Sequence, residues 1–207
     1  MLKNLRSKSL LVVLTVLGTF VDAQENRLGL YSLELSITPL STVHIAPFQS
    51  LIGNGSQESK HYLSGLIRGT YKYNERWSFN AGIGYSTQKV ITESAIVNPE
   101  LERKIYSSNL HVLEIPLEAR LSFLKYFYAN AGPILHFQLN SNDLVDKQTG
   151  VGVTIGVSTK VPLSQRFAVS LSPHYKMYSL IPFQSENYHD RTHIFGVEVG
   201  LVFNIRK

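Results

Sequence analysis

Apolar residues recur at every second position along most of the chain after residue 30. Between Tyr31 and Thr38, for example, apolar side chains at odd positions alternate with polar side chains at even positions. A period of two indicates a β-strand with two unlike faces, because successive side chains point to opposite sides of a sheet. The alternation occupies eight segments, at roughly 31–38, 63–73, 77–86, 113–122, 127–137, 151–161, 167–176 and 195–205. The sequence therefore predicts an all-β protein.

The connections between these segments alternate in length. Segments one, three, five and seven are followed by long connections, at roughly 39–60, 88–108, 140–149 and 181–192. The other three connections are tight turns near Asn74-Glu75, Leu124-Lys125 and Leu163-Ser164. Short turns at one rim and long loops at the other are typical of outer-membrane barrels, whose short turns and termini face the periplasm. We expect an eight-stranded antiparallel transmembrane β-barrel with short periplasmic turns and long extracellular loops.

A soluble eight-stranded calyx would show the same period, because alternation does not say which face is inside. The polar face of this chain is rich in Gly and Ser with isolated charges. That composition favours the crowded lumen of a narrow barrel over a water-exposed surface, which carries more Lys and Glu. Aromatic residues gather near the two ends of the segments, as expected for girdles at the lipid headgroups. The expected loop-side girdle contains Tyr62, Tyr85, Phe137, Tyr175 and Phe195.

The first 23 residues form a segment of different character. Lys3, Arg6 and Lys8 precede an apolar run over 10–20, and Ala23 provides a small residue before a cleavage point. This order is typical of a secretory signal peptide. The run is shorter than the roughly 20 residues that a spanning helix requires. We therefore expect a signal peptide at 1–23 and an outer-membrane barrel at 24–207.

Composition narrows the function classes. The chain has 207 residues, a formal net charge of +5 and no cysteine. Without cysteine there is no disulfide scaffold, thiolate metal site, thiol nucleophile or acylated cysteine anchor. Three of the positive charges lie in the expected signal peptide, so the mature barrel is only mildly basic. We expect no nucleic-acid partner.

The C-terminal segment resembles the signal that outer-membrane barrels present to their assembly machinery. Its pattern is carried by Glu198, Gly200, Phe203 and Ile205, although two basic residues follow it. More widely, the chain resembles the small outer-membrane β-barrel proteins of Bacteroidota-type bacteria, which include PorT-like and OmpA-barrel-like members. The segments that carry this resemblance are 77–85, 113–117 and 128–133. The resemblance implies a scaffold and transfers no catalytic residue.

Charged residues interrupt the polar face at intervals. They are Glu34, Arg68, Lys72, Glu114, Glu118, Arg120, Lys160, Lys176 and Glu198. One hypothesis is a proton or ion path. The favoured hypothesis is a polar plug, because buried charges persist only when paired and eight strands leave room only for side chains. We expect Glu34, Arg68 and Glu198 to form a cluster at mid-height, with Glu114, Glu118 and Lys176 completing the charged lumen.

Two constellations suggest chemistry. Ser172 and His174 share a face, and a triad with Glu198 is conceivable. Outer-membrane lipid A deacylases use a His-x-Ser pair, whereas the order here is reversed and the predicted face is the lumen, so we expect structural roles. His189, Asp190 and His193 have helical spacing in a segment without helical signal, which argues against a metal site. We expect no metal and no cofactor.

Prolines within the predicted strands are a further constraint. Pro116, Pro133 and Pro173 lack an N–H group, and a closed barrel has no free edge to accommodate them. We expect β-bulges or ladder breaks at one or more of them, toward the loop side.

These observations favour a non-enzymatic outer-membrane anchor whose loops or outer wall contact other molecules. The expected partners are outer-membrane lipid, the barrel-assembly machinery and a protein of an outer-membrane complex. Long loops are often functional, and the two candidates contain His44, Phe48 and Leu51 in one and residues 97–104 in the other. The alternatives are a lipid-modifying enzyme of the outer membrane and a small-solute pore.

Overall fold

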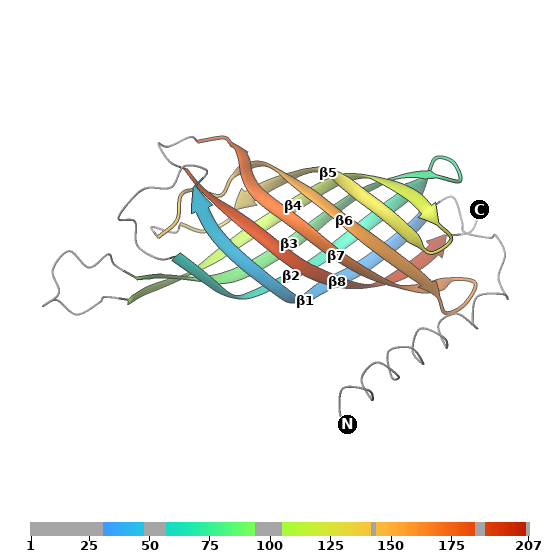
Figure 1. Ribbon diagram of the computed structural model, residues 1–207, viewed down its shortest axis with the longest axis horizontal. Helices are drawn as coiled ribbons and strands as arrows, with labels where there is room; N and C mark the ends of the chain where they lie inside the picture. Colours follow the sequence, from blue (N-terminus) through green and yellow to red (C-terminus); the bar gives the residue numbers. More distant parts are fainter. Residues whose placement is uncertain (1–30, 48–56, 94–104, 142–143, 185–188, 206–207) are drawn as a thin grey trace, which may run out of the picture.

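The computed structural model describes residues 31–47, 57–93, 105–141, 144–184 and 189–205. Eight antiparallel strands close into a barrel in chain order (Figure 1). They are β1 (Tyr31–Pro47), β2 (Gln57–Lys72), β3 (Trp77–Glu93), β4 (Ile105–Leu124), β5 (Phe127–Gln138), β6 (Gly150–Pro162), β7 (Phe167–Pro182) and β8 (Asp190–Ile205). Among these residues no helix is long and apolar enough to cross a membrane. The predicted fold class is confirmed.

The barrel is closed by the pairing of its first and last strands. Tyr31 of β1 lies opposite Ile205 of β8, so both strands end at the rim that carries the short turns. Two of these turns are built alike. The side-chain oxygen of Asn74 accepts hydrogen bonds from the backbone N–H groups of Arg76 and Trp77. Ser164 plays the same role at the β6–β7 turn, so these turns are closed by local side-chain chemistry.

The barrel wall near the short turns has an apolar exterior and a polar interior. On β1, Leu33, Leu35 and Ile37 are exposed, whereas the intervening Glu34 and Ser36 are buried. Successive side chains on a strand point to opposite faces. A bilayer stabilises exposed apolar side chains of this kind, and water would not. The predicted alternation is therefore correct in this half of the barrel.

The strands continue beyond the predicted boundaries into segments that were expected to be loops. β1 has 17 residues and β4 has 20, whereas a tilted strand needs about 9–11 residues to cross a bilayer. His44, placed in a loop by the sequence reading, lies in β1 opposite His193 of β8. Phe48, Leu51 and 97–104 lie outside the described residues, as does the expected signal peptide.

In this extension apolar side chains line the inside of the barrel, whereas nearer the short turns they lie on its outside. Past a bulge between Ile37 and Leu40, the buried residues of β1 are Val43 and Ile45, and the exposed ones include His44. The inside of the barrel is thus apolar here. The loop-side interior forms one cluster, comprising Val43, Ile45, Tyr62, Val90, Leu110, Val112, Val145, Tyr178 and Ile194. Tyr62 belongs to it, so the expectation that Tyr62 lies in the lipid-facing girdle is wrong.

The segment between β5 and β6 covers this apolar cluster. Val145 is buried in it, and Gln148 anchors the segment through side-chain contacts with β7 and β8. The Gln148 amide nitrogen donates to the carbonyl of Asp190 (2.7 Å). Its side-chain oxygen accepts from the hydroxyls of Ser179 (3.3 Å) and Thr192 (3.1 Å). Among the described residues, this segment therefore packs over the apolar interior at the loop end of the barrel.

The pairing of strands is interrupted at all three in-strand prolines, as predicted. The β3–β4 pairing skips Pro116, the β4–β5 pairing skips Pro133 and the β6–β7 pairing skips Pro173. These breaks lie near mid-strand, so their expected position toward the loops is wrong. The β1–β8 pairing has a register shift between Ile37 and Leu40, which is where Pro39 lies. The missing N–H group of proline explains these interruptions.

The topology predicts opposite labelling at the two rims. Since the natural chain has no cysteine, single cysteines can replace the exposed residues Glu75, in a short turn, and Lys147, at the loop end. An impermeant maleimide applied to intact cells should label the Lys147→Cys protein and spare the Glu75→Cys protein. Both should react after cell lysis, which controls for reactivity. Labelling of Glu75→Cys on intact cells would show the reverse orientation.

Candidate functional site: the charged barrel interior

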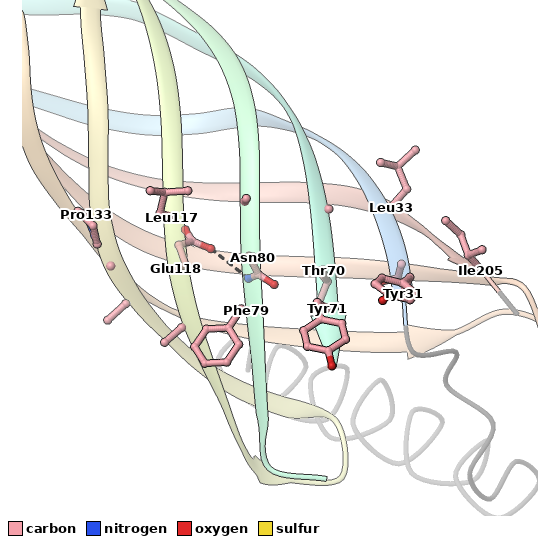
Figure 2. Close-up of a pocket in the computed structure, with 16 residues that line it drawn as sticks. Tyr31, Leu33, Thr70, Tyr71, Phe79, Asn80, Leu117, Glu118, Pro133 and Ile205 are labelled. Atoms are coloured by element: carbon pink, nitrogen blue, oxygen red, sulfur yellow. Dashed lines mark hydrogen bonds between the residues drawn. The ribbon is translucent and has the colours of Figure 1, made fainter. Parts of the chain in front are cut away.

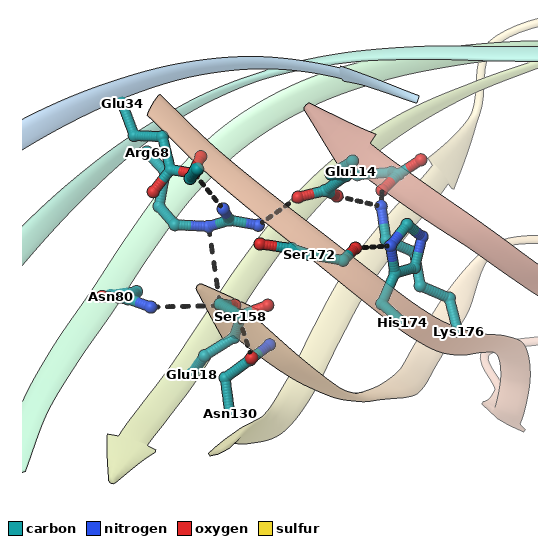
Figure 3. Close-up of polar contacts among 12 residues, drawn as sticks. Glu34, Arg68, Asn80, Glu114, Glu118, Asn130, Ser158, Ser172, His174 and Lys176 are labelled. Carbon is teal, nitrogen blue, oxygen red and sulfur yellow. Dashed lines mark hydrogen bonds and ion pairs between the residues drawn. The ribbon is translucent and has the colours of Figure 1, made fainter. Parts of the chain in front are cut away.

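Arg68 of β2 is the centre of the charged interior. It is 3% exposed and contacts carboxylates from three other strands (Figure 3). Its Nη2 lies 3.0 Å from Glu198, its Nη1 lies 3.5 Å from Glu34 and its Nε lies 3.5 Å from Glu118. The Asn80 amide donates to Glu118 (3.2 Å) and the Ser170 hydroxyl donates to Glu34 (2.6 Å). The structure thus brings Glu34, Arg68 and Glu198 together.

A second cluster lies next to the first on the loop side. Lys176 Nζ is 3.0 Å from Glu114 and 3.2 Å from Glu198, so Glu198 joins the two clusters. The hydroxyls of Tyr178 and Tyr62 donate to Glu114. Because Tyr62 and Tyr178 also belong to the apolar cluster, this layer connects the ionic interior to the hydrophobic one. All six charged residues of the predicted lumen set are therefore buried in one network.

The remaining three predicted lumen cations lie toward the short turns. Arg120 is buried, and its Nη2 is 3.7 Å from Glu34. Arg120 and Lys160 both lie over the ring of Tyr128, at 5.7 and 5.8 Å from its centroid. Lys72 is half-buried at the rim. The interior charge is therefore segregated, with the four carboxylates at mid-height and these three cations toward one end.

The assembly-signal residues divide between the two faces of β8. Phe203 and Ile205 are exposed on the outer wall, whereas Glu198 and Gly200 face inward. A Cβ atom on Gly200 would lie 2.5 Å from the Ser170 hydroxyl and 2.9 Å from Glu34. A side chain there would displace the carboxylate that Arg68 binds. Gly200 therefore has a packing role in the lumen, and the role of this segment in assembly stays a prediction.

Ser172 and His174 are not arranged as a nucleophile and base. The His174 Nδ1 contacts the backbone carbonyl of Ser172 at 3.1 Å, and it must donate its proton to do so. The Ser172 hydroxyl has no hydrogen-bond partner among the described residues, so it is not activated by the ring. A second buried imidazole, that of His136, bridges the Gly150 carbonyl and the Ser179 N–H group. His174 and His136 therefore both hydrogen-bond to backbone groups, which is a structural role.

The other candidate ligands for a metal do not converge. His193 contacts the hydroxyl of Tyr175 (2.7 Å) on the outer wall. His189 lies 3.8 Å from Asp146 at the loop end. Within the part of the chain that the structure describes, no three His, Asp or Glu side chains are grouped to hold a metal ion.

The outer wall carries a shallow apolar hollow near the short turns (Figure 2). Its volume is about 710 Å³, and small residues such as Gly69, Ala81 and Ala131 form its floor. Aromatic side chains of Tyr31, Tyr71 and Phe79 line it, as Figure 2 shows. This surface faces outward from the barrel, where lipid chains contact the wall of a membrane barrel.

Comparison with known proteins agrees with the geometry. Residues 23–150 match the family model described as the outer membrane protein beta-barrel domain. The chain belongs to this family. It is therefore an integral protein of the outer membrane. Comparison with curated protein sequences gives no match.

Two solved outer-membrane barrels have a similar fold. AlkL superposes with a TM-score of 0.54 at 12% identity, covering 89% of this chain and 96% of AlkL. OprG from Pseudomonas aeruginosa superposes with a TM-score of 0.52 at 9% identity, covering 90% of this chain and 100% of OprG. At these identities the likeness concerns the fold of the outer-membrane barrel alone.

Sequence reasoning missed the partners that complete the charged network of this outer-membrane barrel. Tyr178 was overlooked, although it shares the even-numbered face of β7 with Ser172, His174 and Lys176, and that periodicity could have identified it. Tyr62 was assigned to the wrong face. The contact between Arg68 and Glu118 joins strands that are not neighbours, so only the closed barrel reveals it.

Removal of the central guanidinium should destabilise the barrel strongly. In Arg68→Met three buried carboxylates lose their shared partner, and breaking a buried ion pair from one side costs about 3–5 kcal/mol. The free energy of unfolding, measured with urea in lipid vesicles, should fall by about this amount. Lys89→Met removes an exposed charge from β3 and should change it by less than about 0.5 kcal/mol. A similarly small effect of Arg68→Met would show that the network does not stabilise the barrel.

Proposed function

We propose that this protein is a non-enzymatic outer-membrane scaffold whose barrel is a closed anchor. It would hold its loops and outer wall in position for a protein partner, as an accessory subunit of an outer-membrane complex. The observation that carries the proposal is the filled interior. The ionic network around Arg68, the apolar cluster around Tyr178 and the segment around Gln148 follow one another along the barrel.

The same observation argues against the small-solute pore. A pore needs a continuous aqueous path, and eight strands leave an interior that side chains fill. Arg68, Arg120 and Tyr178 are among the largest side chains in this lumen, and each is at most 3% exposed. Water and ions would have to displace paired charges, at a large cost in free energy.

The finer family assignment belongs to the same proposal. The segments that resemble the Bacteroidota-type small barrels, including 77–85 and 113–117, lie within β3 and β4. The resemblance of these segments supports a Gram-negative bacterium of that kind as the source and a PorT-like role as an accessory protein. The outer-membrane family match supports export by the signal peptide at 1–23, since an outer-membrane protein must leave the cytoplasm. Co-purification from native outer membranes followed by mass spectrometry would identify the partner.

The closed barrel predicts the absence of conductance. Purified protein reconstituted in planar bilayers should give no stable openings above those of protein-free bilayers. The double variant Arg68→Ala and Tyr178→Ala removes a large side chain from each interior layer, and it should leak more than the natural protein. Stable openings of the natural protein would overturn the closed-anchor proposal in favour of the pore.

The non-enzymatic assignment predicts that the lumen serine and histidine are dispensable for lipid chemistry. Ser172→Ala and His174→Ala should each leave the acylation pattern of the outer-membrane lipids unchanged, measured by mass spectrometry of extracted lipids. Barrel abundance should be checked by immunoblotting in the same strains. An altered acylation pattern at normal barrel abundance would replace the scaffold proposal with the lipid-modifying enzyme.

A further inference from the structure

The short-turn end of the barrel opens into a basic vestibule, defined as the cavity lined by Lys72, Arg76, Arg120, Lys125 and Lys160. Its volume is about 450 Å³, and among the described residues its lining contains these five cations and a single carboxylate, that of Glu75. Outer-membrane barrels place this rim in the periplasm. A concave site with an excess of one charge attracts ligands of the opposite charge.

Arg120 lines the vestibule and has unused hydrogen-bonding capacity. The residue is 1% exposed, yet its Nε and Nη1 atoms have no hydrogen-bond acceptor among the described residues. The contact of its Nη2 with Glu34, at 3.7 Å, is longer than the 2.7–2.9 Å typical of a charge-assisted hydrogen bond. Ser170 and Arg68 contact Oε1 of Glu34, at 2.6 and 3.5 Å. Oε2 of Glu34, which faces Arg120, has no hydrogen-bond partner among the described residues, so the two groups do not satisfy each other. Buried donors of this kind normally have acceptors.

Lys160 adds a second cation at the same place. It shares the ring of Tyr128 with Arg120, and within the described part of the chain no carboxylate lies within ion-pair distance of it. The aromatic ring offers both cations a partial counter-charge, but it cannot accept the hydrogen bonds that they offer. Two positive charges held at one ring repel each other, and an anion bound between or beside them would offset this repulsion.

We propose that the basic vestibule binds a phosphate group. A guanidinium presents its N–H donors as a planar fork that matches two oxygens of a phosphate. Together with Lys160 it offers two positive charges, which match a phosphate dianion better than a carboxylate. Lys72 and Arg76 at the rim increase the attraction. The inference does not depend on the closed-anchor proposal, because binding at this rim is measured separately from conductance.

The test is calorimetric titration of the protein in maltoside micelles, which contain no phosphate, with sodium phosphate at low ionic strength. Saturable binding at one site is expected. Arg120→Gln and Lys160→Gln should each weaken binding about tenfold or more, because each removes a charged hydrogen-bond donor. Lys89→Gln, which removes an exposed cation at the other end of the barrel, should leave affinity within about twofold.

Folding of each variant is checked by the gel-mobility shift between boiled and unboiled barrel. Lys160→Gln keeps the test decisive if Arg120→Gln fails to fold, because Lys160 makes no contact with the Arg68 network in the ion pairs described. Absence of saturable phosphate binding by the natural protein would overturn the proposal. So would equal loss of affinity in Lys89→Gln, or competition by acetate as strong as that of phosphate.

Two sources of the phosphate group are distinguished by repeating the titration in lipid bilayers. If the natural ligand is a soluble phosphate compound, the affinity in phosphatidylglycerol nanodiscs should equal that in maltoside micelles. If the ligand is a lipid headgroup, phosphatidylglycerol should compete, and the apparent affinity for inorganic phosphate should fall at least tenfold. Either result supports a phosphate site and identifies its source.

Discussion

The structure depends on the narrowness of an eight-stranded ring. Closure leaves an interior that side chains must fill. In the membrane-spanning half the apolar side chains face outward and the alternate, polar side chains face the interior. A charge in such a place is tolerated only with partners. Arg68 satisfies this constraint by contacting three carboxylates, and Gly200 satisfies it by leaving space for one of them. The ion-pair network is therefore a consequence of the barrel's size.

The same constraint has a different solution in the loop-side half. There the strands continue beyond the length that a bilayer requires, and the interior becomes an ordinary hydrophobic core around Leu110 and Ile194. Glu114 lies at the transition, since it binds Lys176 on one side and the hydroxyls of two core tyrosines on the other. The same strands thus have apolar residues outside in one half and inside in the other. On β1 the change occurs beside the bulge near Pro39.

This exchange explains which features could be predicted from the sequence. The membrane-spanning wall and the turns at Asn74 and Ser164 were predictable, because alternation and turn chemistry are local signals. The strand extensions were missed because apolar residues change face there, so Tyr62 was assigned to the lipid side. The inward direction of the lumen charges was predictable, but their partners were not. The contact of Arg68 with Glu118 and the closure by Gln148 join residues distant in sequence, and no local period encodes them.

The extended strands also determine how the protein presents itself to its surroundings. With a rise of about 3.3 Å per residue along a tilted strand, the extension raises the loop-side ends of the strands on the order of 15 Å above the apolar band. The hydrophobic core makes this extension a stiff stalk rather than a set of flexible tethers. The loop-side ends of the described strands present a backbone that is already ordered, and binding to an ordered surface loses less conformational entropy than binding to a flexible one.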